Sequence, residues 1–277
     1  MESMTNAPHL LVGARKGYRY GAATMYDHMA MDGLEDAYER GKAMGVFAES
    51  CVAKYEFTRE AQDQFAITST ERAIAANKDG SFAWEMAPVT IKGKAGDTVI
   101  DKDEQPFKAK LDKIPGLKPA FKKDGTITAA NASSISDGAA ALVLMRASTA
   151  AAKGLKPGLK KDGTISAANA SSFSFVFAAL VLMRASTAAA KGLKPIARIV
   201  AHSTHAHAPE WFTTAPVGAI QKVLAKSNWK VGDVDLWEVN EAFAAVTMAA
   251  MKEFDLPHAK VNIHGGACAL GHPIGAS

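Results

Sequence analysis

Two side chains in the last quarter of the chain have residue types and positions that suit proton transfer and the stabilisation of a developing negative charge. Asn240 follows the segment 234–239, which is predicted to be a strand, and precedes a run with helical spacing, 241–254. Ligand-contacting groups lie at that end of the strands in open α/β sheets. The amide of Asn240 could donate to an oxyanion or hold a water that does so; the alternative is a helix cap.

His272 is the second of these side chains. It lies between Gly271 and Pro273 in a glycine-dense stretch that follows a short apolar run. Glycines let backbone approach a ligand closely, and an imidazole with a near-neutral pKa suits proton abstraction from a thiol or donation to an oxyanion. The alternative is that His272 has only a structural role.

Other reactive residue types give weaker signals. Cys51 has apolar, helical surroundings, and Cys268 precedes His272 by four residues. We expect Cys268 to be structural, with a low-pKa thiolate beside His272 as the alternative. Three histidines at 202, 205 and 207 have spacing that could suit a metal, but no nearby carboxylate or thiol completes a tetrahedral set, so we expect no metal.

The elements that must position these residues alternate between strand and helix. Helical spacing predicts helices over 25–49, 58–77, 216–226 and 241–254. Short segments between them, 98–100, 196–201 and 234–239, are predicted to be strands. This alternation favours an α/β fold.

Composition limits the class of protein. The chain has 277 residues, 48% hydrophobic and 22% charged, with a net charge of +4. That charge is mild for a nucleic-acid binder and suits a small anionic ligand better. The longest apolar stretch, 173–183, is too short to span a membrane, and with no secretory signal and only two cysteines we expect a cytoplasmic protein.

A repeat occupies the middle of the chain. Residues 116–153 recur as 154–191 with seven differences over 38 positions, and each copy is predicted to contain a short strand at its Thr-Ile pair, a small-residue loop and an Ala-rich helix. Four of the differences replace Ile135, Asp137, Gly138 and Ala139 by three Phe and a Val in the second copy. A recent tandem duplication or an error in assembling the sequence explains two copies better than a solenoid does.

Several segments together resemble a known family. NEAFA at 240–244 and N-x-x-G-G-x-x-A-L-G-H-P-x-G-A-S at 262–277 resemble the thiolases, the acyl-CoA C-acyltransferases that include acetyl-CoA C-acetyltransferases and 3-ketoacyl-CoA thiolases. MESMTNAPHLL at 1–11 and NASSISDGAAA at 131–141 are similar to further segments of that family. The resemblance covers nearly the whole chain apart from the extra copy.

The resemblance implies roles for individual residues. His272 would activate a cysteine nucleophile and be one oxyanion donor, and Asn240 would hold the water of an oxyanion hole. Ser133 would touch the pantetheine arm of coenzyme A, and Met44 and Phe243 would lie near the acyl pocket. Coenzyme A and acyl-CoA would be the partners, as substrates and without a further cofactor, and the family assembles as homodimers or homotetramers.

The resemblance also implies a layered α/β fold of two similar halves, with a loop domain inserted in the first. We expect 1–195 to be the remainder of the first half, with the loop domain and both copies, and 196–277 to be a truncated second half. The family's nucleophilic cysteine would precede Met1, and its second catalytic cysteine would follow Ser277. We therefore expect the first strands of one half and the last elements of the other to be missing.

Two hypotheses about function follow. The first is a thiolase-type acyltransferase whose 277 residues alone have little or no turnover, because both catalytic cysteines are absent from them. The second is a non-catalytic, thiolase-like fragment that binds coenzyme A or contacts another subunit. Related condensing enzymes would have His at position 240, so Asn240 favours a thiolase proper.

Overall fold

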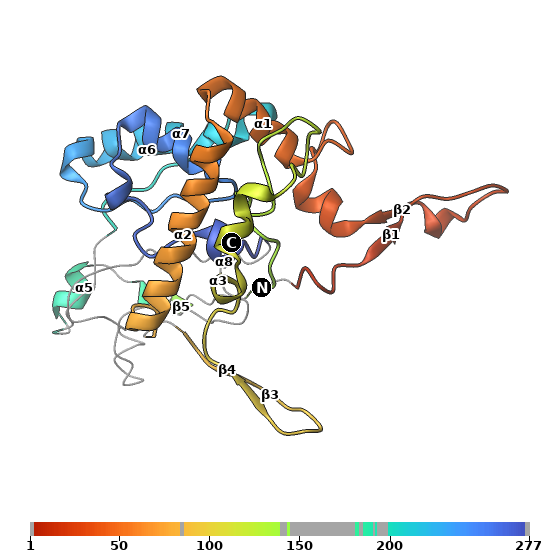
Figure 1. The fold of residues 1–277 in the computed structure, drawn as a ribbon, viewed down its shortest axis with the longest axis horizontal. Coiled ribbons are helices and arrows are strands. Elements are labelled where there is room, and N and C mark those ends of the chain that lie inside the picture. Colours follow the sequence, from red (N-terminus) through yellow and green to blue (C-terminus); the bar gives the residue numbers. More distant parts are fainter. Residues whose placement is uncertain are drawn as a thin grey trace.

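The computed structural model describes residues 3–83, 86–138 and 199–274, together with the short pieces 143–144, 181–182, 185–190 and 192. A long helix, α2 (Arg59–Asp79), runs through the middle of the molecule (Figure 1). It contacts α7 (Ala244–Phe254) and the short helices α3 (Gln105–Lys108) and α8 (Ala267–Leu270). The remaining α-helices are α1 (Met44–Tyr55), α5 (Ala185–Ala190) and α6 (Ala215–Ser227).

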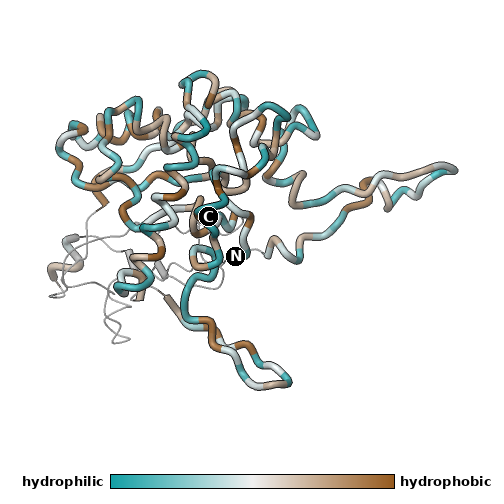
Figure 2. The backbone as a smooth tube through the Cα atoms, viewed as in Figure 1, coloured by the Kyte–Doolittle hydropathy of each residue, from teal (hydrophilic) through white to brown (hydrophobic). Residues whose placement is uncertain are grey.

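The strands of the described residues form three two-stranded pairs. Strand β1 (His9–Leu11) pairs antiparallel with β2 (Met25–Asp27), and β3 (Val89–Ile91) pairs antiparallel with β4 (Thr98–Ile100). Both hairpins extend away from the helices, with apolar residues on their strands (Figures 1 and 2). The layered sheet that we expected is therefore not formed by the part of the chain that the structure describes.

Short 3₁₀ and π helices complete the secondary structure. The 3₁₀ helices are Ala14–Lys16, Leu111–Gly116, Pro209–Thr214, Val231–Asp233 and His258–Lys260, and the π helix is Ala30–Leu34. No described helix is long and apolar enough to cross a lipid bilayer.

Small side chains let α1 and α7 approach closely. Ala48, Cys51, Ala245 and Ala249 are fully buried in one apolar cluster that also contains Ile127. With few atoms beyond Cβ on either face, the two helix backbones can pack at short range.

Helix α2 begins and ends with the signals that its sequence contains. The Thr58 hydroxyl accepts a hydrogen bond from the N–H of Ala61 at 3.1 Å, and Gly80 ends the helix with φ of 81°. Its apolar residues pack on α7 and α8 in two clusters: Phe65 and Ala66 with Ala244 and Cys268, and Ala73 and Ala76 with Ala269 and Leu270. The helix predicted over 58–77 is thus confirmed.

Three more predicted elements are confirmed. The helix at 216–226 is α6, with Pro216 in its first turn, and the strand at 98–100 is β4. The helix at 241–254 is α7, which begins three residues later than predicted.

Of the strand predicted at 196–201, residues 199–201 are not in a strand and 196–198 lie outside the described residues.

The single helix predicted over 25–49 is wrong. This segment contains β2, a π helix and a turn before α1 begins at Met44. The turn forms because the Asp36 carboxylate accepts hydrogen bonds from the N–H groups of Tyr38 and Glu39, and because Gly41 adopts φ of 84°. Local side-chain to backbone bonds here replace helical ones.

The strand predicted at 234–239 is reduced to one parallel bridge between Trp237 and Val261. The ladder stops because Asn262 has φ of 46°, which turns the chain away. The Asn262 side chain then bonds to both backbone groups of Val239, accepting from its N–H and donating to its carbonyl, each at 2.8 Å. The Asn262 amide thus forms the hydrogen bonds that a neighbouring strand would form with Val239.

The two copies of the repeat meet at one strand pair. Strand β5 (Val143–Leu144) lies parallel to β6 (Val181–Leu182), and each residue pairs with its own equivalent in the other copy. Helix α5 confirms the Ala-rich helix of the second copy in part. The other elements predicted for the second copy, and the Ala-rich helix of the first, lie outside the described residues, as do the four apolar replacements. In the first copy, the Thr-Ile pair at 126–127 is not in a strand.

Candidate active site

The site forms where three loops lie side by side. The loop at 131–137 pairs on one side with the loop that precedes α7: Ala132 bridges Phe243, and the N–H of Ser133 donates to the carbonyl of Ala242 at 3.0 Å. The N–H of Ala244 donates back to the carbonyl of Asn131 at 2.8 Å. The segment that contains Asn240 is thereby fixed to the 131–137 loop.

On its other side the same loop pairs with the segment that contains His272. The N–H of His272 donates to the carbonyl of Ser134 at 2.8 Å, and the N–H of Ser136 donates to the carbonyl of His272 at 3.3 Å. Gly271 makes this approach possible, since its φ is 90° and a Cβ there would lie 2.1 Å from the Ser136 hydroxyl. Backbone pairing therefore sets the position of His272.

The two predicted catalytic side chains meet across this arrangement. The Asn240 Nδ2 lies 3.4 Å from the His272 Nε2, and both residues are half-buried. An amide nitrogen only donates, so the contact makes Nε2 the acceptor and leaves the ring proton on Nδ1. Burial lowers the pKa of His272 below its ordinary value of 6.5, so the ring is neutral at pH 7 and able to accept a proton.

The three predicted substrate-binding residues border the same loops. The Ser133 hydroxyl donates to the carbonyl of Ala242 at 3.0 Å, so its lone pairs can still accept from a ligand. Phe243 is buried, with its ring edge-to-face against Phe121 at 6.0 Å. Half-buried Met44 packs against the same apolar cluster as Phe243.

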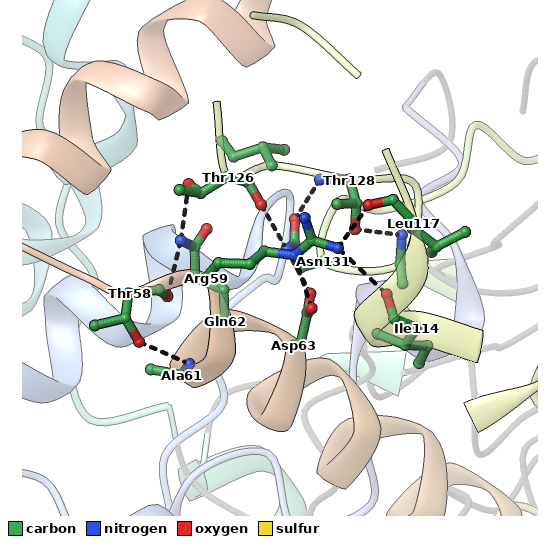
Figure 3. Close-up of polar contacts among 12 residues, drawn as sticks. Thr58, Arg59, Ala61, Gln62, Asp63, Ile114, Leu117, Thr126, Thr128 and Asn131 are labelled. Atoms are coloured by element: carbon green, nitrogen blue, oxygen red, sulfur yellow. Dashed lines mark hydrogen bonds and ion pairs between the residues drawn. The ribbon is translucent and has the colours of Figure 1, made fainter. Parts of the chain in front are cut away.

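A polar network that the sequence reading missed anchors the 131–137 loop (Figure 3). The Asn131 amide donates to the Asp63 carboxylate at 3.0 Å and to the carbonyl of Thr126 at 3.1 Å, and it accepts from the N–H of Thr128 at 2.8 Å. Arg59 in turn donates to Asp63 at 2.7 Å and to two backbone carbonyls. The i, i+4 spacing of Arg59 and Asp63 was the signal available in the sequence.

Both cysteines are buried and lie within the core. Cys51 is fully buried between α1 and α7, and burial raises the pKa of its thiol. Cys268 packs with Phe65 and Ala244, and its thiol donates to the carbonyl of Glu241 at 3.7 Å. Burial and nearby Glu241 raise the pKa of Cys268 well above its ordinary value. Neither thiol is a ready nucleophile at neutral pH.

Among the described residues, no group of three or more His, Cys, Asp or Glu side chains is placed to hold a metal ion. The rings of His205 and His207 are 5.1 Å apart, and His207 faces Thr214.

Family models match most of the chain. The thiolase N-terminal domain matches residues 1–148, and the thiolase C-terminal domain matches residues 193–277.

Individual relatives agree with the family models. Over the whole chain, acetyl-CoA acetyltransferase 2 of Arabidopsis thaliana is 42% identical, and an acetyl-CoA acetyltransferase of Chromobacterium violaceum is 43% identical. The chain spans 60% and 61% of the length of these two relatives.

Solved structures show the same fold. The acetyl-CoA acetyltransferase of Bacillus anthracis matches 99% of the chain with a TM-score of 0.78 and 36% identity. The Acat5 thiolase of Ascaris suum in complex with coenzyme A matches all of it with a TM-score of 0.77 and 33% identity. The chain covers 60% of each of these structures. Because family models and solved structures agree along nearly its full length, this chain belongs to the thiolase family.

Proposed function

We propose that the chain is part of a thiolase-type acyl-CoA C-acyltransferase, which moves an acetyl group between acetyl-CoA or a 3-ketoacyl-CoA and coenzyme A. The observation that carries the proposal is the 3.4 Å contact between Asn240 and His272, held by backbone pairing on both sides of the 131–137 loop. Relatives at about 40% identity that are acetyl-CoA acetyltransferases support the choice of substrate.

In this proposal, His272 is the base that takes the proton of a thiol and returns it later. A neutral, half-buried imidazole suits that step once a thiol takes the place of the Asn240 amide at Nε2, because the ring can accept a proton at pH 7 without first losing one. Asn240 holds a water or donates its own amide hydrogen toward the oxygen of the thioester as negative charge develops there. Removing one such donor from an oxyanion hole typically slows acyl transfer about 10²–10³-fold.

The substrate contacts follow from the same loops. Ser133 offers a hydroxyl beside the site for the pantetheine arm, and Met44 and Phe243 offer apolar surface for a short acyl chain. Coenzyme A is then a substrate, and no further cofactor is required. The homo-oligomeric state and the cytoplasmic location expected from the sequence stay predictions.

The thiol chemistry of the reaction needs a reactive cysteine, and the two that these 277 residues contain are both buried with raised pKa values. We infer that the 277 residues alone bind acyl-CoA but turn it over slowly or not at all. The same observation favours a second candidate function, a non-catalytic thiolase-like chain that binds coenzyme A or contacts another subunit.

Thiolysis of acetoacetyl-CoA by the purified chain with added coenzyme A tests this proposal, with Cys268→Ala as the matched control. Absence of turnover in both proteins, together with binding of acetyl-CoA, is the expected result. Turnover that is lost in Cys268→Ala would show that this thiol is the nucleophile, which contradicts our assignment. Failure to bind acetyl-CoA at all would contradict the acyltransferase and coenzyme A-binding functions and leave only contact with another subunit.

A further inference from the structure

A buried carboxylate lies directly beside the candidate site. Glu241 follows Asn240 and is fully buried. Its carboxylate accepts three hydrogen bonds, from the Ser69 hydroxyl at 2.7 Å, the Asn262 amide at 2.8 Å and the N–H of Cys268 at 3.1 Å. These donors come from α2, from the turn at 262 and from α8.

The donors indicate that Glu241 is ionised. A backbone N–H and an amide NH₂ only donate, and the Ser69 oxygen already accepts from the N–H of Gly266 at 2.9 Å, so its own hydrogen is free for Glu241. Burial raises the pKa of Glu241, while these hydrogen bonds and the positive charge of Arg72 oppose the rise. Buried charges are tolerated when their hydrogen bonds are complete.

Glu241 and Asn262 together hold both neighbours of Asn240. One Asn262 side chain bonds to the N–H and carbonyl of Val239 and also donates to the Glu241 carboxylate. Residue 239 on one side and residue 241 on the other are thus tied to a single amide. The backbone that presents Asn240 has little freedom to move.

The same carboxylate fixes the segment that leads to His272. It accepts from the N–H of Cys268 in α8, and Ser69 links it to the N–H of Gly266 just before that helix. Gly266 lies so close that a Cβ there would be 2.4 Å from the carboxylate carbon of Glu241. Gly271 ends α8 with a bond from its N–H to the carbonyl of Ala267, and His272 follows.

We propose that Glu241 is a positioning residue that sets the separation between Asn240 and His272, a proposal that rests on the function proposed above for these two side chains. Its carboxylate accepts from the Asn262 amide, which holds the backbone beside Asn240, and from the N–H of Cys268 in the helix that precedes His272. Glu241 is fully buried, so in this proposal it acts through Asn240 and His272.

Glu241→Gln tests the proposal, because glutamine keeps the shape but replaces one acceptor oxygen by a donor that faces other donors. The readout is the pH titration of the His272 ring nitrogens by ¹⁵N NMR in the full chain. We expect the pKa of His272 to rise toward 6.5. We also expect the ¹⁵N chemical shift of Nε2 to show that this nitrogen no longer accepts a hydrogen bond. Ser69→Ala is the second variant if Glu241→Gln does not fold. It removes one donor and leaves the carboxylate, so we expect a smaller shift of the His272 pKa in the same direction.

Asp36→Asn is the matched control. Asp36 is also buried and accepts two backbone N–H bonds, but in the turn before α1. The Asp36→Asn variant should have a lower melting temperature and an unchanged His272 titration. The proposal is overturned if Glu241→Gln and Ser69→Ala also lower the melting temperature and leave His272 as in the wild type.

Failure of the proposed function gives a different result. If acetyl-CoA leaves the wild-type His272 signals in place while Glu241→Gln still shifts the His272 pKa, the function of the site is wrong and the positioning role of Glu241 stands.

Discussion

The His272 imidazole is placed by its backbone, and its chemistry is set by its surroundings. Pairing with Ser134 and Ser136 fixes the main chain, and Asn240 faces the ring at Nε2. Burial then favours the neutral ring. A base that is oriented and neutral at pH 7 is what proton transfer from a thiol needs.

The first prediction concerns the titration of His272. Its pKa should lie below 6.5, with the ring proton on Nδ1, because burial disfavours the charged form and Asn240 donates to Nε2. The unfolded chain then binds this proton at higher pH than the folded chain, so the stability contributed by neutral His272 is complete above pH 6.5 and declines below it. Ring ¹⁵N spectra across pH 5–8 measure this, with His272→Gln for assignment; a pKa at or above 6.5 would contradict it.

The second prediction concerns the two thiols. Cys51 and Cys268 should resist iodoacetamide in the folded chain at pH 7.5, because both are buried and their raised pKa values leave little thiolate. Mass spectrometry counts the labelled thiols, and the same chain in denaturant provides full labelling for comparison. Rapid labelling of Cys268 under native conditions would show that this thiol is accessible.

At the residue scale, sequence motifs were sufficient to find Asn240 and His272 and to bring Ser133, Met44 and Phe243 into the same hypothesis. The roles of these residues stay predictions, although the structure brings Asn240 and His272 together. Glu241 and Asn262 were missed because their importance lies in bonds to Ser69 and to each other, across 172 and 21 residues of sequence. No local pattern contains such contacts.

At the scale of elements, helices were easier to predict than strands. The helix α2 has its cap and its periodicity within its own sequence. A strand depends on its partner strand. In two segments predicted to be strands, side chains bond to the backbone groups that a partner strand would have paired with. Glu49 accepts from the N–H groups of Thr126 and Ile127, each at 2.9 Å, and Asn262 bonds to Val239. Tertiary contacts decide whether a side chain or a neighbouring strand forms the hydrogen bonds of a given backbone segment.

The third prediction tests the start of α2. Thr58→Ala removes the oxygen that accepts from the N–H of Ala61 and should cost about 1 kcal/mol of unfolding free energy, the usual value for losing such a cap. Thr58→Ser keeps the oxygen and should stay near the wild type. Urea unfolding followed by circular dichroism measures both. Equal stability of the Ala and Ser variants would mean that the cap contributes nothing.

At the scale of the whole molecule, α2 links the parts that form the site. It packs against α7 and α8, which border the Asn240 and His272 segments, and its Asp63 holds the 131–137 loop through Asn131. The two hairpins extend away from this centre (Figure 1). The contacts described for the site all come from residues 44–138 and 237–274.

The fourth prediction concerns the repeat. Deleting 154–191 removes one copy and joins Lys153 to Gly192, which restores the local sequence at the junction. Strand β5 loses its partner β6, so we expect a lower melting temperature. The His272 titration should not change, because the contacts described for the site come from residues 44–138 and 237–274. An unchanged or raised melting temperature would show that the β5–β6 pair adds no stability, and a shifted His272 pKa would show that the copy supports the site.

The fifth prediction tests the central claim, that these loops form a site for an acyl-CoA with Asn240 and His272 at its centre. Titration of acetyl-CoA into the ¹⁵N-histidine-labelled chain should shift the His272 ring signals in a saturable way and leave those of His9, on the distant β1–β2 hairpin, in place. Asn240→Ala should change the shift of His272 without abolishing binding. If saturating acetyl-CoA leaves the His272 signals of the folded wild type unmoved, the account of this site is wrong.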